Sequence, residues 1–117
     1  MLFLEYPACS TCKKAKAWLV THNVAFESRH IKEENPSMEE LKLWYQRSGF
    51  PLKKFFNTSG LAYKSLGLKD KLPMMSEDEQ LQLLASDGML VKRPLVILED
   101  RVLVGFREAE WEQALLG

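Results

Sequence analysis

The sequence predicts an α/β protein in which a mixed sheet is flanked by helices. Two observations support this class: a strand–helix–strand pattern opens the chain, and a strand–strand–helix pattern closes it. A third is the run of helical patterns between them. The chain has 117 residues, 46% of them hydrophobic, which suffices for one buried core. We therefore expect a single domain over residues 1–117.

The opening pattern predicts a parallel βαβ unit. Residues 2–6 form an apolar run that is typical of a strand, and Pro7 ends it in a turn. Residues 11–22 have helical spacing of apolar side chains up to Asn23, and residues 25–31 form a second extended run. Because a helix of about a dozen residues joins the two runs, we expect a right-handed crossover between parallel strands.

The middle of the chain predicts a helical insertion at about residues 37–88. Ser37 with Glu40, and Ser76 with Glu79, have the spacing of capping boxes at helix N-termini. Shorter apolar segments between them indicate further short helices. The insertion has too few residues to form a separate domain.

The closing pattern predicts a hairpin and a last helix. Residues 95–98 and 102–104 are apolar and rich in β-branched side chains, and three polar residues separate them. Residues 107–116 then have a helical pattern. The whole order, βαβ, helical insertion, ββα, is that of a thioredoxin-like fold with an insertion between its halves.

A pair of thiols lies where the first strand leads into the first helix. The segment Cys9-Ser10-Thr11-Cys12 contains both cysteines of the chain. Free backbone N–H groups and the helix dipole stabilise a thiolate at such a position, which lowers the cysteine pKa. The second thiol is close enough to attack a mixed disulfide. The alternative, that both cysteines only pack beneath the helix, is weaker because CxxC at a strand–helix junction is typical of redox chemistry.

Charge and hydropathy exclude several classes of protein. Sixteen basic and sixteen acidic residues cancel, the pI is about 6.7, and no long run of one sign occurs, so we expect no direct binding to nucleic acid. No apolar stretch approaches the roughly 20 residues that span a bilayer, and no secretory signal is apparent. We therefore expect a cytoplasmic protein without a membrane association, where a lone CxxC is a cycling pair or a metal site.

A zinc site at these cysteines is the less favoured alternative. His22 and His30 are the two histidines of the chain, and they could complete four ligands. The spacing C-x2-C-x9-H-x7-H does not match the usual zinc patterns, and His22 near a helix C-terminus has a simple electrostatic role. We expect no metal.

Three separated segments resemble the arsenate reductase family, which also contains the Spx regulators. These segments are residues 6–15, 49–63 and 92–106, with the sequences YPACSTCKKA, GFPLKKFFNTSGLAY and KRPLVILEDRVLVGF. The resemblance spans the whole chain, and three segments in order are more specific than a lone CxxC.

The resemblance implies roles for residues around the thiols. Cys9 stands where the family's nucleophile attacks arsenate. Ser10, Thr11 and the helix amides would bind the oxyanion, although one hydroxyl can equally cap the helix. Pro94 stands where thioredoxin-like proteins have a cis proline facing the cysteine, which would bring Arg93 near Cys9 to hold an oxyanion by two hydrogen bonds.

Two further positions and Cys12 affect the choice of substrate. Arg107 stands at a second substrate arginine of the reductases, or is merely solvated at the start of the last helix. Lys53 replaces what resembles another substrate arginine, and a lysine lacks bidentate geometry, so we expect weak arsenate reduction. Cys12 supplies an internal resolving thiol, which resembles the Spx branch.

The resemblance supports two functions. The first is a thiol–disulfide oxidoreductase in which Cys9 attacks, Cys12 resolves, and glutathione with glutaredoxin, or thioredoxin, recycles the protein without a bound cofactor. Its substrate would be a small oxyanion or a thiol or disulfide. The alternative is an Spx-like redox sensor that binds RNA polymerase. Spx regulators are usually longer at the C-terminus, which favours the enzyme; a third hypothesis is an inactive relic.

Overall fold

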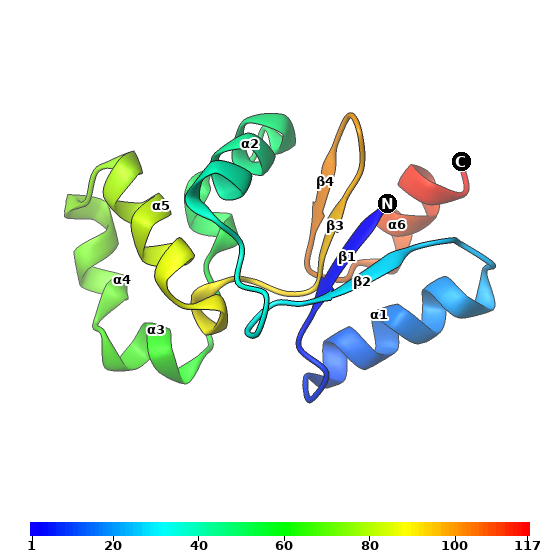
Figure 1. The fold of residues 1–117 in the computed structure, drawn as a ribbon, viewed down its shortest axis with the longest axis horizontal. Coiled ribbons are helices and arrows are strands. Elements are labelled where there is room, and N and C mark those ends of the chain that lie inside the picture. Colours follow the sequence, from blue (N-terminus) through cyan, green and yellow to red (C-terminus); the bar gives the residue numbers. More distant parts are fainter.

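The computed structural model describes residues 1–117, and its four-stranded sheet has helices on both sides (Figure 1). None of these helices combines the length and apolar character needed to cross a bilayer. The elements in chain order are β1 (Leu2–Glu5), α1 (Ser10–Thr21), β2 (Glu27–His30), α2 (Met38–Ser48), the 3-10 turn η1 (Leu52–Phe55), α3 (Leu61–Ser65), α4 (Leu68–Lys71), η2 (Leu72–Met74), α5 (Glu77–Ser86), η3 (Gly88–Leu90), β3 (Leu95–Ile97), β4 (Val102–Val104) and α6 (Glu108–Leu115).

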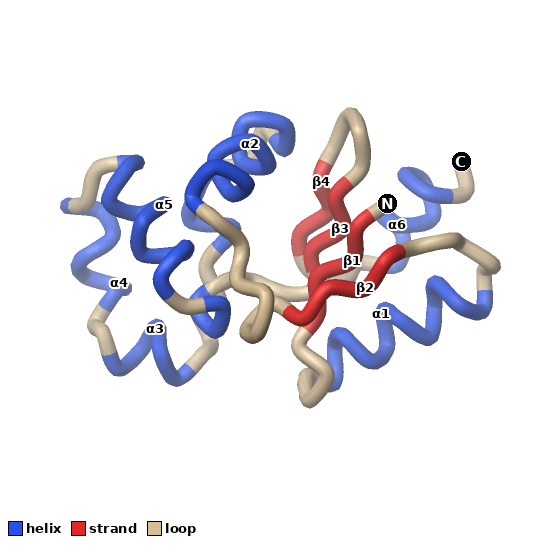
Figure 2. The backbone as a smooth tube through the Cα atoms, in the orientation of Figure 1, coloured by secondary structure: helices blue, strands red, loops and turns tan.

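The sheet has the strand order β2-β1-β3-β4, with β1 in its interior (Figure 2). β1 pairs in parallel with β2, where Phe3 lies opposite Ser28, and antiparallel with β3, where Phe3 lies opposite Val96. β3 and β4 form the antiparallel hairpin. The predicted α/β class, the parallel crossover and the hairpin are therefore confirmed.

The second strand is shorter than predicted, beginning at Glu27 rather than at residue 25. Its partner explains the difference. Glu27 donates its N–H to the Met1 carbonyl at 2.9 Å, and the pairing starts with Leu2 opposite Glu27. Because β1 itself begins at Leu2, residues 25 and 26 have no β1 residue to pair with.

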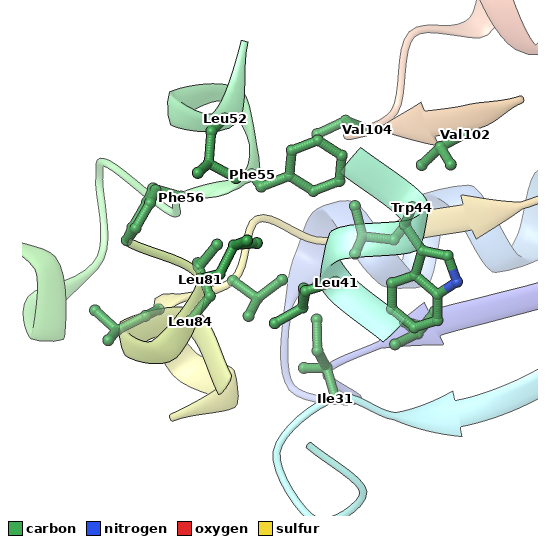
Figure 3. Packing of buried hydrophobic residues seen from close by; sticks show 14 of the residues in the cluster. Ile31, Leu41, Trp44, Leu52, Phe55, Phe56, Leu81, Leu84, Val102 and Val104 are labelled. Carbon is green, nitrogen blue, oxygen red and sulfur yellow. The ribbon is translucent and has the colours of Figure 1, made fainter. Parts of the chain in front are cut away.

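The sheet separates two hydrophobic clusters, because side chains alternate between its faces. On one face Phe3 belongs to a cluster of seven buried residues that includes α1 and α6 side chains such as Trp18 and Trp111. On the other face Leu4 belongs to a cluster of 18 buried residues built mainly from the helical segment. Figure 3 shows Leu41 and other members of the larger cluster between α2, α5 and the sheet.

Both predicted capping boxes form in the helical segment. The Ser37 hydroxyl accepts from the Glu40 N–H at 3.1 Å, and the Glu40 carboxylate accepts from the Ser37 N–H at 3.0 Å. Ser76 and Glu79 make the same pair of bonds at α5. Glu40 also accepts two hydrogen bonds from the Arg29 guanidinium, at 2.6 and 2.9 Å. This bidentate ion pair ties β2 to the start of α2.

Candidate active site

The turn between β1 and α1 places the two thiols at a helix N-terminus. Cys9 is the N-cap residue, with φ −78° and ψ 124°, and its N–H donates to the Tyr6 carbonyl at 2.9 Å. The Cys9 carbonyl accepts the first helical bond, from Lys13 at 3.1 Å. Cys12 lies within the first turn and is fully buried, whereas Cys9 is only half-buried. One thiol is therefore open to reagents and the other is covered.

The pKa values of the two thiols move in opposite directions. Partial burial alone would raise the pKa of Cys9. The backbone N–H and the thiol of Cys12, the Thr11 N–H and the charge of Arg93 outweigh it, so this pKa falls below its ordinary value of 9.0. Burial raises the pKa of Cys12 to about 12, and the neighbouring Cys9 adds to the rise. Cys9 is thus the thiol that ionises first.

The Arg93-Pro94 peptide bond is cis, as predicted. The Arg93 guanidinium lies 5.3 Å from the centre of the Tyr6 ring, and its Nη1 donates to the Met89 carbonyl at 3.2 Å. Its charge contributes to the lowered pKa of Cys9 and offsets part of the rise in the pKa of Cys12, and it lines the same cavity as Cys9. The guanidinium and the Cys9 thiol therefore share one cavity.

The loop between β4 and α6 completes the site beside the cis proline. Gly105, with φ 75°, donates its N–H to the Pro94 carbonyl at 2.9 Å and accepts at 3.2 Å from the buried Trp111 indole. The positive φ suits glycine. These two bonds fix the loop so that Phe106 and Arg107 line the cavity around Cys9.

A cavity of about 810 Å³ opens at Cys9, and its lining includes residues from the start, the helical segment and the C-terminal part of the chain. It brings together four residues predicted for the site, Cys9, Thr11, Arg93 and Arg107. Its other charged lining residues are Lys54, Lys92 and Asp87. With four cations against one carboxylate, the lining of the cavity carries a net positive charge.

The structure does not bring every predicted residue into this cavity. Ser10 is exposed and Pro94 is buried, and neither lines it. Lys53 lies outside it and lines two other hollows, while Lys54 takes a place within it. The cause is the 3-10 turn, which buries Leu52 and Phe55 and so directs the two intervening lysines to different sides.

Sequence reasoning missed several lining residues, among them Lys54, Asn57, Asp87 and Lys92. Two local signals were available: Lys92 directly precedes Arg93, and Asn57 lies within the second family-like segment. Nothing in the local sequence around Asp87 indicates that it lines a cavity together with a thiol more than seventy positions earlier.

The two histidines lie apart from any metal-binding group. His22 Nδ1 lies 2.8 Å from the Trp18 carbonyl, and its ring stacks on Trp18 at 4.1 Å. His30 Nδ1 accepts from the N–H groups of Lys32 and Glu33. No group of three or more His, Cys, Asp or Glu side chains is placed to hold a metal ion.

A thiol pair at a helix N-terminus, beside a cis proline on a mixed four-stranded sheet, defines the thioredoxin-like class. Within this class the chain belongs to the ArsC family, whose model matches residues 4–114. The predicted family and fold are thereby confirmed.

Relatives and solved structures agree with this assignment. The chain is 57% identical to the uncharacterized protein YusI of Bacillus subtilis over 97% of this chain and 96% of YusI. It is 33% identical to the global transcriptional regulator Spx of Enterococcus faecalis over 89% and 77% of the two chains.

Among solved structures, an ArsC family related protein from Bacteroides fragilis matches with a TM-score of 0.93 and 60% identity, over 96% of this chain and 94% of the other. A possible arsenate reductase from Streptococcus mutans matches with a TM-score of 0.89 and 47% identity, over 97% of each chain. The family therefore includes both reductase-like proteins and regulators.

Proposed function

We propose that the protein is a cytoplasmic thiol–disulfide oxidoreductase in which Cys9 is the nucleophile and Cys12 the resolving thiol. The observation that carries this proposal is the asymmetry of the pair. Cys9 opens onto a basic cavity and has a lowered pKa, whereas Cys12 is fully buried and has a raised one. A structural pair would need no such difference, and a redox pair needs one thiolate and one reserve thiol.

The proposed reaction moves two electrons from the thiols to a disulfide. The Cys9 thiolate attacks one sulfur of the substrate, forming a mixed disulfide and expelling the other half as a thiolate. That attack removes the charge on Cys9 that opposes ionisation of Cys12. Cys12 then loses its proton and attacks the Cys9 sulfur, which forms the Cys9–Cys12 disulfide and releases the second half of the substrate as a thiolate.

The cations of the cavity select an anionic substrate. Arg93 donates to the protein only through Nη1, which bonds to the Met89 and Val91 carbonyls. The N–H groups on Nε and Nη2 are therefore free to bind a ligand. Arg107 and the Thr11 hydroxyl line the same space. At about 30 Å³ for each water-sized group, the cavity has room for on the order of twenty-five such groups. The cavity therefore has room for an organic anion as well as for an inorganic oxyanion such as arsenate.

The oxidised pair must be reduced before another cycle. We propose glutathione with glutaredoxin, or thioredoxin, as the source of electrons, because each supplies thiols that attack a disulfide. Neither the attack nor the resolution needs a bound metal or an organic cofactor.

Single-turnover oxidation of the reduced protein by a small anionic disulfide tests the proposal. Cys9→Ser should abolish release of the substrate thiol, and Cys12→Ser should stop at a mixed disulfide detectable by mass. Lys54→Met should slow the reaction, whereas Lys53→Met, a matched control outside the cavity, should not. Thiol release that persists in Cys9→Ser would contradict the mechanism.

A second function, an Spx-like redox sensor that binds RNA polymerase, is favoured by the 33% identity to Spx of Enterococcus faecalis. In that case the same thiol pair would report the redox state rather than turn over substrate. Affinity capture from a lysate, under reducing and oxidising conditions, separates the two functions. Recovery of glutaredoxin or thioredoxin supports the enzyme, and recovery of RNA polymerase supports the sensor.

A further inference from the structure

Asp87 is the single acidic residue in the lining of the Cys9 cavity, among four cations. It is half-buried and takes part in none of the protein's three ion pairs. A carboxylate in a cavity that otherwise favours anions works against the binding of a purely anionic ligand. A ligand that carries a cation as well as anionic groups would offset this repulsion.

The structure holds Asp87 firmly on the wall that carries Arg93. The carboxylate accepts from the Met89 N–H at 2.9 Å, and the Met89 carbonyl accepts from Arg93 Nη1 at 3.2 Å. The turn that carries Asp87 also packs tightly against the segment after β2, because a Cβ at Gly88 would lie 2.0 Å from the Ile31 carbonyl oxygen. Asp87 and Arg93 therefore present opposite charges to the cavity from neighbouring points.

We propose that Asp87 binds the ammonium group of a low-molecular-weight thiol substrate, while the cations of the cavity bind its carboxylates. This inference rests on the proposed function, since the thiol would be the half of the disulfide that bonds to Cys9. The substrate class is then the amino-acid-type thiols, which carry a carboxylate and an ammonium close together. Asp87 acts as a specificity residue, and the chemistry at sulfur remains with Cys9 and Cys12.

A role of Asp87 in capping the turn is separable from a role in binding. Asparagine caps a helical turn about as well as aspartate, and it carries no charge. Asp87→Asn therefore keeps the bond to the Met89 N–H and removes the attraction for an ammonium. Asp70→Asn is the matched control, because Asp70 lines a different hollow.

The experiment compares two disulfides that differ in the ammonium. Cystine carries it, and dithiodipropionate has the same carbon chain and carboxylates without it. Single-turnover rates of the reduced protein with each disulfide are divided by the rate of the same disulfide with a free small thiol. The wild type should favour cystine by about tenfold or more, as expected for one charge-assisted hydrogen bond. Asp87→Asn should lose this preference, and Asp70→Asn should keep it.

Other outcomes overturn the inference. Equal normalised rates for the two disulfides in the wild type would do so without any variant, and so would a preference that survives in Asp87→Asn. N,N′-diacetylcystine gives a second measurement on the wild type and should react like dithiodipropionate. A rate that survives Cys9→Ser would instead overturn the proposed function and the inference with it, so the two failures are distinguishable.

Discussion

Alkylation of the reduced protein should label Cys9 far faster than Cys12. Thiolates react with iodoacetamide and thiols do not, so the rates follow the ionised fractions. A thiol with the ordinary pKa of 9.0 is about 1% ionised near pH 7, and the pKa of Cys9 lies below that value. At a pKa of about 12, Cys12 is ionised to only on the order of one part in a hundred thousand. Ionisation alone therefore predicts a ratio above about a thousandfold, and the burial of Cys12 adds to it.

The assay is a time course of iodoacetamide labelling between about pH 5 and pH 9, quenched with acid and analysed by peptide mass spectrometry. The pH midpoint for Cys9 reports its pKa. Cys12→Ala removes the thiol that hydrogen-bonds to Cys9 and should raise the Cys9 midpoint, while Cys12→Ser, which retains a donor, should raise it less. Labelling of Cys12 at a rate comparable to that of Cys9 would refute the reasoning.

Three other perturbations have expected outcomes. Arg93→Met should raise the pH midpoint of Cys9 alkylation and slow reaction with an anionic disulfide by about tenfold to a hundredfold, measured against a neutral disulfide that should be affected less. Gly88→Ala should lower the free energy of unfolding in urea by about 2 kcal/mol or more, because its Cβ would meet the Ile31 carbonyl; an unchanged midpoint would be inconsistent with the close contact. The ion pair of Glu40 lowers the pKa of this carboxyl from 4.5 to about 2, so its stabilisation is present above about pH 4.5 and is lost as pH falls toward 2. Because this carboxyl is partly exposed, the loss should be about 1 kcal/mol, and Glu40→Gln should flatten the pH dependence in that window.

Features that depend on neighbours along the chain could be predicted from the sequence. The capping boxes at Ser37 and Ser76 are made by residues three positions apart, so their spacing is sufficient to identify them. The thiol pair is likewise a local feature of the turn before α1. The predictions for the position of Arg93 and for its cis bond to Pro94 came from the family resemblance, because a resemblance carries information about which distant parts of the chain lie together.

Features that depend on tertiary packing could not be predicted in this way. The side of the 3-10 turn on which Lys53 or Lys54 lies is decided by which neighbours the core buries, and both lysines look alike in the sequence. Asp87 has the local pattern of a capping residue, which it also is. Its place in the lining of the Cys9 cavity depends on the packing of Gly88 against Ile31, a contact between segments far apart in the sequence.

The two walls of the Cys9 cavity are supported by different hydrophobic clusters. Cys9 caps α1 and Thr11 lies in its first turn, and this helix packs on one face of the sheet, whereas Lys54, Leu61 and Asp87 belong to the segment that packs on the other. The nucleophile and the part of the lining that carries Lys54 and Asp87 are thus supported by different hydrophobic clusters. Substitutions around Lys54 and Asp87 can alter which molecule reaches the Cys9 sulfur, while the hydrogen bonds that stabilise the Cys9 thiolate stay intact. The substrate preference of this fold can therefore change through one part of the cavity lining while the redox chemistry at Cys9 stays the same.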